Sequence, residues 1–321
     1  MKQAILVTGG AGYIGSHTAL FLAQQGYIPI ILDSFVYNQP FSPSWATVIK
    51  QDCADVATLR EIFTRYPIKA VMHFAASIEV GKSVHDPCLF YQNNVSKTIT
   101  LMQTMLEHNI KNFIFSSSCA VYGIPQELPL REHHPKSPIS PYGKTKLMVE
   151  SILEDFSHAY GLNYIGLRYF NAAGLTPGHG LGEYHEPETH VLPLLLRASK
   201  QYSPFFIYGS EHQTQDGTCI RDYLHVYDIA NAHKLALDYL VNGGQSAFYN
   251  LGTGIGISVK QLIDTVQRVT GNKINVVLSD PRAGDPAVLV ADPSNAFTNL
   301  GWRPEQSAIQ HIIQSALLHQ H

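Results

Sequence analysis

Short apolar runs rich in valine, isoleucine and phenylalanine alternate with longer amphipathic stretches through the first half of the chain. The apolar runs predict strands at residues 4–8, 28–32, 46–50, 70–74, 113–117 and 164–169. The stretches between them predict helices at residues 15–25, 56–65, 89–109 and 141–160. Strands that alternate with helices are typical of a parallel sheet covered by helices on both faces and joined by right-handed crossovers. We therefore predict an α/β fold with a doubly wound parallel sheet.

The pattern changes after Asn171. Residues 174–188 are rich in Gly, Pro, His and Glu, and the apolar segments that follow are short. Such a change marks a domain boundary or a loop-rich lobe. We expect residues 1–172 to form the first domain and residues 173–321 to form a smaller C-terminal α/β lobe. Within that lobe, a helical pattern followed by a strand-like run predicts that about residues 224–253 return to the first domain.

The composition is that of a globular protein. Of the 321 residues 45% are hydrophobic and 15% are charged, and 22 basic against 25 acidic side chains give a formal net charge of -3. This balance excludes a disordered chain and a protein that binds nucleic acid through a basic surface. No run reaches the 18 or so consecutive apolar residues of a membrane span, and a strand-like run begins directly after Lys2. We therefore expect no membrane partner and no targeting segment.

One polar loop raises the question of a metal site. It contains three histidines and three glutamates: His179, Glu183, His185, Glu186, Glu188 and His190. Their spacing matches no helical or hairpin ligand motif, so we favour a polar loop and predict no metal. The cysteines form no Cys-x-x-Cys pair and lie far apart, at Cys53, Cys88, Cys119 and Cys219. This argues against zinc and against a short-loop disulfide framework, and it fits a reducing, cytoplasmic location.

The first predicted strand leads into a glycine-rich turn that opens a helix. Gly9, Gly12 and Gly15 satisfy the Gly-x-x-Gly-x-x-Gly pattern, which allows a tight turn and close approach to a pyrophosphate at the helix N-terminus. Asp33 ends the next strand, where a carboxylate would accept hydrogen bonds from the adenosine ribose. Its charge would repel a 2′-phosphate, and residues 34–38 contain no Arg or Lys. We therefore predict a Rossmann-type sheet that binds NAD rather than NADP.

A second motif follows the fifth predicted strand. Tyr142 and Lys146 have the helical Tyr-x-x-x-Lys spacing, so their side chains share one face. The strand before them ends at Ser118, at the carboxyl edge of the sheet where open α/β folds bind ligands. We expect Lys146, together with the nicotinamide charge, to stabilise the Tyr142 phenolate and lower its pKa from the usual ~10. Ser118 would donate a hydrogen bond to the reacting oxygen.

Arg221 and Arg282 lie in loops of the second half, next to Gly and Asp residues. A diphosphate is best held by cations that present a planar fork of donors. We expect these two arginines to hold a diphosphate, with surface salt bridges as the alternative.

Several longer segments follow one another in a characteristic order. They are TGGAGYIG at 8–15, HFAA at 73–76, NNV at 93–95, SSSCAVYG at 116–123 and YGKTK at 142–146. In this order they resemble the extended short-chain dehydrogenase/reductase family. Three later segments resemble the UDP-hexose 4-epimerases of that family: RYFN at 168–171, DGTCIRDY at 216–223 and RAGD at 282–285. The resemblance covers nearly the whole chain.

The resemblance implies a bound NAD and a UDP-hexose substrate. Besides the glycines, the NAD contacts that it implies are Tyr13, Ile14, Asp33, Asp52, Cys53, Phe74, Ala75, Ala76, Asn93, Tyr142, Lys146 and Phe170. The sugar-nucleotide contacts that it implies are Ser118, Asn171, His190, Val191, Phe206, Tyr208, Arg221, Arg282 and Asp285. The C-terminal lobe is therefore expected to bind the substrate.

The implied activity is interconversion of UDP-galactose and UDP-glucose through transient oxidation at C4 of the sugar. Dehydratases of the family place an Asp-Glu pair after the active-site hydroxyl residue, whereas this chain has Cys119 and Ala120 there, so we do not expect elimination. Ile78 stands where the epimerases often carry a polar residue, which leaves only a backbone contact with the cofactor. Leu289 stands where some members carry an aromatic residue, which leaves room for 2-acetamido sugars.

Two alternatives remain at this point. The substrate could be another UDP-sugar, such as an N-acetylhexosamine, a pentose or a uronic acid. The protein could also be a regulator that senses the cofactor but catalyses no reaction. Such a regulator has no need for Ser118, Tyr142 and Lys146 together. The family's dimers suggest a homodimer built on the helices at 89–109 and 141–160. A helix that covers a sheet shows a similar apolar stripe, so the sequence alone leaves the dimer open.

Overall fold

The computed structural model describes residues 3–37, 41–182, 188–281 and 285–318. Its largest sheet has seven parallel strands in the order β10-β6-β5-β4-β1-β2-β3. The strands are β1 (Ala4–Thr8), β2 (Ile28–Asp33), β3 (Thr47–Lys50), β4 (Ile68–His73), β5 (Asn112–Ser118), β6 (Asn163–Tyr169) and β10 (Ala247–Leu251). The six strands predicted for the first half are confirmed to within two residues.

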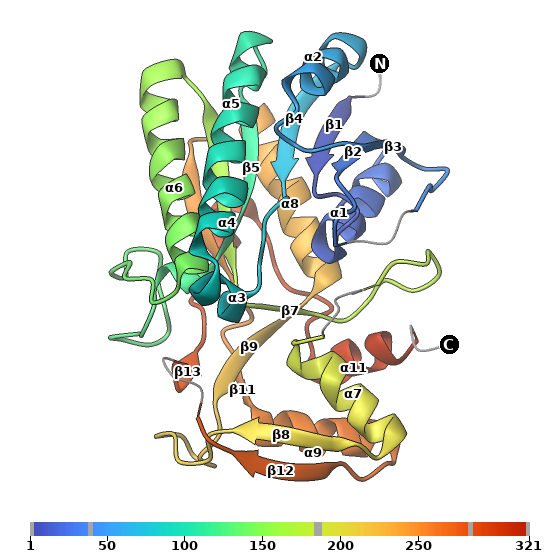
Figure 1. The fold of residues 1–321 in the computed structure, drawn as a ribbon, viewed down its shortest axis with the longest axis vertical. Coiled ribbons are helices and arrows are strands. Elements are labelled where there is room, and N and C mark those ends of the chain that lie inside the picture. Colours follow the sequence, from blue (N-terminus) through green and yellow to red (C-terminus); the bar gives the residue numbers. More distant parts are fainter. Residues whose placement is uncertain (1–2, 38–40, 183–187, 282–284, 319–321) are drawn as a thin grey trace.

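Both faces of this sheet are covered by helices (Figure 1). Alternate residues of β1 enter two different cores, with Ile5 and Val7 in one and Ala4 and Leu6 in the other. The first core contains α1 (Tyr13–Gln24), α8 (Val226–Val241) and α10 (Ser294–Leu300). The second contains α2 (Val56–Arg65), α5 (Lys97–Glu107) and α6 (Pro141–Tyr160). Continuous apolar strands with both faces buried require this arrangement, and the doubly wound α/β prediction is confirmed.

The long helix predicted at 89–109 is wrong as a continuous element. The chain forms α4 (Pro87–Tyr91), a π-helical turn η1 (Gln92–Ser96) and then α5. Asn94 causes the interruption, because its buried amide donates to the backbone oxygen of Ser77 at 2.9 Å and to Thr145 Oγ1 at 3.1 Å. A short helix α3 (Val80–His85), which the pattern does not predict, precedes α4. Such π-turns are frequent at functional sites.

A smaller group of elements lies beyond the carboxyl ends of the large sheet (Figure 1). Its strands are β7 (Asn171–Ala173), β8 (Pro204–Tyr208), β9 (Ile220–His225), β11 (Gly256–Ser258), β12 (Asn275–Ser279) and β13 (Val288–Leu289). Its helices α7 (Val191–Gln201), α9 (Val259–Thr270) and α11 (Ile309–Leu317) share a third core. This group therefore faces the edge where the predicted site lies, while the domain boundary at residue 172 stays a prediction.

Candidate active site

The glycine turn between β1 and α1 leaves no room for side chains. Gly9 has φ of +69°, and a Cβ there would lie 2.4 Å from the backbone nitrogen of Ala75. A Cβ on Gly15 would lie 2.3 Å from the carbonyl oxygen of Gly9. Gly12 caps α1 without a side-chain hydrogen bond, and the first turn contains no acidic residue. The helix N-terminus therefore offers its N–H groups to an anion, which fits the pyrophosphate of NAD.

Asp33 is fixed beside this turn at the end of β2. Its Oδ2 accepts a hydrogen bond from Ala11 N at 2.9 Å, and its Oδ1 accepts one from Phe35 N at 2.8 Å. The side chain is buried. Because each carboxylate oxygen can accept more than one hydrogen bond, this fixed carboxylate fits the predicted contact with ribose hydroxyls.

The other predicted NAD residues lie on loops and helices around the same edge. Asp52 is paired with Lys97 at 2.5 Å. Burial raises the pKa of the neighbouring Cys53 thiol to about 12, so that thiol stays protonated at neutral pH. The Phe74 ring packs against His233 with 4.6 Å between ring centroids. Asn93 lies in the π-turn and its amide donates to Ser77 Oγ at 3.3 Å.

Tyr13, Ile14, Ala76 and Phe170 complete that set. The Tyr13 hydroxyl donates to the carbonyl oxygen of Gly174 at 2.5 Å, which joins α1 to the loop after β7. Ile14 packs against the first core, and Phe170 is buried in a small separate core with Tyr122.

The structure brings Ser118, Tyr142 and Lys146 together. Ser118 ends β5, and Tyr142 lies in the first turn of α6, which begins at Pro141 and is capped by Ser140 Oγ accepting from Gly143 N at 3.1 Å. A hydrogen bond joins the Tyr142 and Ser118 side chains. Lys146 Nζ lies 5.8 Å from the centroid of the Tyr142 ring and donates to the carbonyl oxygen of Ser116 at 2.8 Å.

The predicted lowering of the Tyr142 pKa includes the charge of a bound nicotinamide and stays a prediction. Burial raises the pKa of Tyr142 to about 12, and the hydrogen bond to Ser118 opposes this only in part. Burial also lowers the pKa of Lys146 to about 7, against the opposing charge of Glu150. The physical reason is desolvation, because both charged forms lose water at this site. A further positive charge is needed to bring the phenol toward neutral pH.

Three predicted substrate residues meet in the second lobe. Asn171, His190 and Val191 line a cavity of about 100 Å³ together with Tyr223. His190 Nδ1 lies 3.0 Å from Glu188 Oε1 and precedes α7. The structure therefore brings these residues together from β7 and from the start of α7.

Phe206 and Tyr208 lie on β8, and both are exposed. The loop expected at Arg221 is wrong, because the residue lies in β9, where it pairs with neighbouring strands. Arg221 forms an ion pair with Asp285 and also donates to the carbonyl oxygen of Ile220 at 2.8 Å. The Arg221 charge reaches the Cys119 thiol, since it opposes the burial that raises the pKa of that thiol to about 12. Arg221 of the second lobe therefore lies near Cys119, the residue that follows Ser118.

Leu289 pairs with Arg221 between β13 and β9, so the two residues are neighbours. Arg282 lies outside the described residues, as do Glu183, His185 and Glu186 of the polar loop. Within the described ranges no group of three or more His, Cys, Asp or Glu side chains could hold a metal ion. In those ranges no helix is long and apolar enough to cross a membrane.

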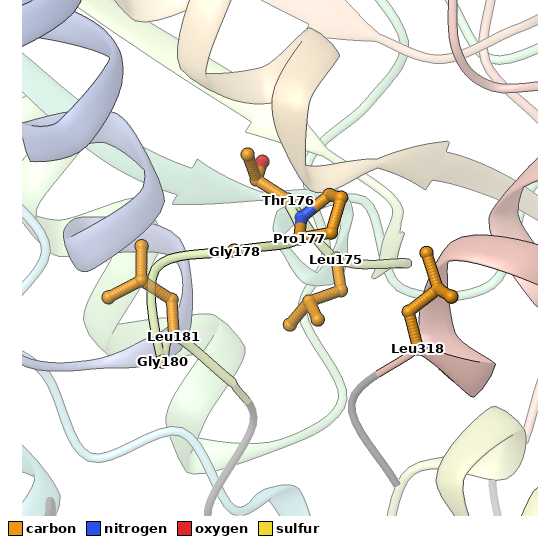
Figure 2. Close-up of a pocket in the computed structure, with 7 residues that line it drawn as sticks. All are labelled: Leu175, Thr176, Pro177, Gly178, Gly180, Leu181 and Leu318. Carbon is orange, nitrogen blue, oxygen red and sulfur yellow. The ribbon is translucent and has the colours of Figure 1, made fainter. Parts of the chain in front are cut away.

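A second cavity, of about 200 Å³, contains none of the predicted residues. It lies between the loop that carries Leu175 and Leu181 and Leu318, which follows α11 (Figure 2). The described residues that line it include no titratable side chain.

Sequence reasoning missed buried polar residues just behind the site. His73 lies between Thr8 Oγ1, 2.7 Å from Nδ1, and Thr98 Oγ1, 2.8 Å from Nε2. Burial lowers its pKa to about 3, so the ring is neutral and serves as a hydrogen-bonding brace. Glu150 and Arg168 form an ion pair on the same side of the sheet. The signal in the sequence was a polar residue inside an otherwise apolar strand, at His73 and Arg168.

Comparisons with known proteins agree with this geometry. Residues 5–252 match the NAD dependent epimerase/dehydratase family. A UDP-glucose 4-epimerase of Halalkalibacterium halodurans is 47% identical over 98% of this chain and 94% of that protein.

Two solved structures of UDP-glucose 4-epimerases are also similar. The Brucella ovis enzyme in complex with NAD has a TM-score of 0.95 and 44% identity, covering 99% of this chain and 98% of that one. The Bifidobacterium longum enzyme in complex with NAD+ and UDP has a TM-score of 0.92 and 35% identity, with the same coverage of both chains. The chain therefore belongs to the NAD dependent epimerase/dehydratase family.

Proposed function

We propose that the chain is a UDP-glucose 4-epimerase, which interconverts UDP-galactose and UDP-glucose with NAD bound throughout. The observation that carries this proposal is the grouping of Ser118, Tyr142 and Lys146 at the edge of the sheet that also bears the glycine turn. The same activity is assigned to relatives that align over nearly the whole chain.

NAD would be held by the glycine turn at its pyrophosphate and by Asp33 at its adenosine ribose. When bound, it accepts a hydride from C4 of the sugar and returns it, so no external oxidant is consumed. The other NAD contacts proposed are Tyr13, Ile14, Asp52, Cys53, Phe74, Ala75, Ala76, Asn93, Tyr142, Lys146 and Phe170. The positive charge of the nicotinamide is the further charge that the Tyr142 phenol needs.

Tyr142 is proposed as the base that takes the proton of the 4-hydroxyl group. Ser118 is hydrogen-bonded to the phenol and would donate to the same sugar oxygen as charge develops on it. The Lys146 ammonium group donates a hydrogen bond to the Ser116 carbonyl oxygen. This bond holds the ammonium group near the Tyr142 ring. When the hydride returns, Tyr142 gives the proton back to that oxygen.

The residues after Ser118 favour epimerisation over elimination. Loss of water from the sugar needs a carboxylic acid and a base beside the reacting carbons, and the chain has Cys119 and Ala120 there. Burial keeps the Cys119 thiol protonated. Cys119 and Ala120 therefore cannot supply the acid and the base that elimination needs at neutral pH.

The sugar nucleotide would be anchored at one end only. Arg221 is proposed to hold the diphosphate, and Asp285 fixes its guanidinium. The other substrate contacts proposed are Asn171, His190, Val191, Phe206, Tyr208 and Arg282. Firm binding of the nucleotide and loose binding of the hexose allow the hexose to turn so that the hydride returns to its other face.

UDP-N-acetylhexosamines are a second candidate substrate. The observation that favours them is Leu289 of β13, which is aliphatic and pairs with Arg221 of β9. An aromatic ring at this position would reduce the space beside the sugar. We also propose a homodimer, supported by the resemblance to the family's dimers, and a cytoplasmic location, supported by the cysteine usage.

The direct test is to incubate the purified protein with UDP-galactose and no added NAD. We expect UDP-glucose to form, with NAD released only on denaturation. A product that has lost water would instead show a dehydratase, and the absence of any product would favour a cofactor-sensing regulator. Either of those results contradicts the proposed function.

A further inference from the structure

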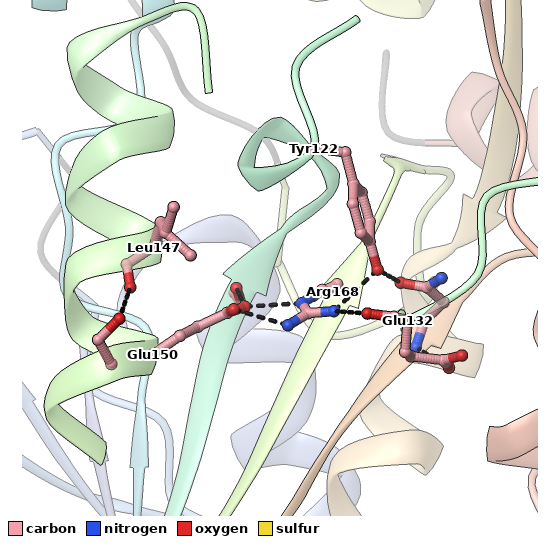
Figure 3. A network of polar contacts seen from close by, with 8 residues as sticks. Tyr122, Glu132, Leu147, Glu150 and Arg168 are labelled. Carbon is pink, nitrogen blue, oxygen red and sulfur yellow. Dashed lines mark hydrogen bonds and ion pairs between the residues drawn. The ribbon is translucent and has the colours of Figure 1, made fainter. Parts of the chain in front are cut away.

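A buried ion pair joins Glu150 to Arg168 (Figure 3). Arg168 of β6 donates from Nε to Glu150 Oε1 at 2.8 Å and from Nη2 to Glu150 Oε2 at 2.7 Å. The two side chains are 1% and 2% exposed. Glu150 lies one helical turn after Lys146 on α6, so the pair joins the helix that carries Tyr142 and Lys146 to the sheet.

The same carboxylate also holds the strand that carries the site. Ser117 Oγ donates to Glu150 Oε1 at 2.6 Å. Ser117 lies between Ser116, whose carbonyl oxygen accepts the Lys146 hydrogen bond, and Ser118. Glu150 therefore binds α6 to β5 at Ser117, the residue between Ser116 and Ser118.

The network continues to the segment that follows Ser118. Arg168 Nη1 donates to the Tyr122 hydroxyl at 2.9 Å, and that hydroxyl donates to Asn250 Oδ1 at 2.6 Å. Asn250 lies on β10, and its amide donates to the carbonyl oxygen of Leu130 at 2.9 Å. Ser118 is thus fixed through its neighbours on both sides.

The stability of the fold does not by itself explain this pair. Removing two charges from water costs several kcal/mol per ion, and apolar residues of similar volume often serve a core equally well. A buried pair next to a reactive site therefore indicates a contribution to the chemistry. The nearest candidate is Lys146, because its ammonium must stay charged while buried.

Tyr142 and Glu150 on α6 and His73 on β4 face Lys146. Tyr169 and Arg168 on β6 are hydrogen-bonded to its neighbours Ser116 and Glu150. His73 is neutral, and burial keeps both phenols protonated. Glu150 supplies the negative charge that opposes the loss of the Lys146 proton, which burial favours.

We propose that Glu150 is a positioning residue for the epimerisation, which holds Ser117 and Ser118 at their distance from α6 and presents its carboxylate on the same face of that helix as Lys146. This inference rests on the proposed function. Glu150 touches neither substrate nor cofactor in this account, and it acts through Lys146 and Ser117.

The test is the pH profile of kcat for Glu150→Gln. In this account turnover requires the charged form of Lys146, so kcat falls as pH rises through the pKa of that ammonium group. The Glu150 charge raises this pKa. Its removal should therefore move the alkaline limb of the profile to lower pH by roughly one unit, the usual effect of one nearby charge. KM for UDP-galactose should stay within about twofold, because none of the proposed substrate contacts changes. A profile that coincides with that of the unmodified protein after correction for active protein overturns the proposal.

Matched variants separate charge, position and stability. Glu154→Gln removes a carboxylate one turn further along α6, on the exposed side, and should leave kcat and the profile unchanged. Glu150→Asp and Ser117→Ala keep the charge but loosen the contact between α6 and β5. Both should lower kcat about tenfold or less with the alkaline limb in place. If Glu150→Gln does not fold, these two decide, and unmodified kcat in both overturns the proposal.

The outcome is distinguishable from failure of the proposed function. If the unmodified protein does not convert UDP-galactose, the function itself is wrong. If it does and the Glu150 variants behave as the Glu154 control does, only the role of Glu150 is wrong.

Discussion

The two lobes hold their functional cations in different ways. Lys146 in the first lobe is almost fully buried and bonded to a backbone carbonyl within a rigid helix-and-sheet layer. Arg221 in the second lobe lies on a short strand and is held by a carboxylate that is itself one-third exposed. Burial lowers the pKa of the first cation, whereas the second is placed by its ion pair with Asp285. Under the proposed function, proton transfer takes place where water is excluded, and the substrate is recognised where the side chains are more exposed.

Tyr142→Phe tests the first lobe most severely. Removing the hydroxyl deletes the proposed base while the ring still fills its place, so kcat should fall about 10³-fold, within the usual range for acid–base catalysis. Bound NAD, measured by absorbance after denaturation, should remain at the level of the unmodified protein. Near-normal turnover would remove Tyr142 from its role.

Gly9→Ala tests whether the glycine turn holds the cofactor. The new methyl group would lie 2.4 Å from the Ala75 nitrogen, in addition to the strain of a positive φ. We expect the purified variant to contain less than about a tenth of the bound NAD. Gly26→Ala is the matched control, because its φ of +88° carries the same kind of strain in open space. Equal NAD content in both variants would show that strain alone, rather than the close approach, is responsible.

Arg221→Gln tests the recognition lobe. Loss of a charge-assisted contact with the diphosphate costs about 1.5–3 kcal/mol, so KM for UDP-galactose should rise roughly 10- to 100-fold. Because Arg221 is not part of the proposed proton transfer, kcat should change much less. Steady-state kinetics measure both constants, and a fall in kcat at constant KM would break the division between the lobes.

Leu289→Tyr should have the smallest effect. The ring would fill space next to Arg221, so turnover of UDP-N-acetylglucosamine should fall several-fold more than turnover of UDP-galactose. The ratio of the two values of kcat/KM measures this directly. An unchanged ratio would show that Leu289 does not border the sugar.

Predictability from the sequence differs between the lobes for physical reasons. The strands β1 to β6 are local apolar runs, and all but the edge strand β3 are mostly buried, so their pattern alone places them. The π-turn could not be predicted, because it depends on Asn94 reaching Ser77 and Thr145 across the fold. The short, half-exposed strands of the second lobe carry little pattern, and their site residues came from the family resemblance.

The sequence predicted which residues group at the end of β5 and the start of α6, but not how burial shifts their pKa values. Spacing and position brought Ser118, Tyr142 and Lys146 together, as the structure does. A sequence shows the cation near Tyr142 but not the loss of water around both groups, and this burial raises the pKa of the phenol in the chain itself. Glu150 and Arg168 were missed as a pair, since they lie 18 residues apart and meet only through the packing of α6 on the sheet.

The most direct test of the account follows the hydrogen at C4. UDP-galactose that carries deuterium at C4 should be converted, without added NAD, to UDP-glucose that retains the deuterium at C4, because the same hydride is removed and returned within one site. Loss of the label to solvent, or formation of no UDP-glucose, would contradict the account.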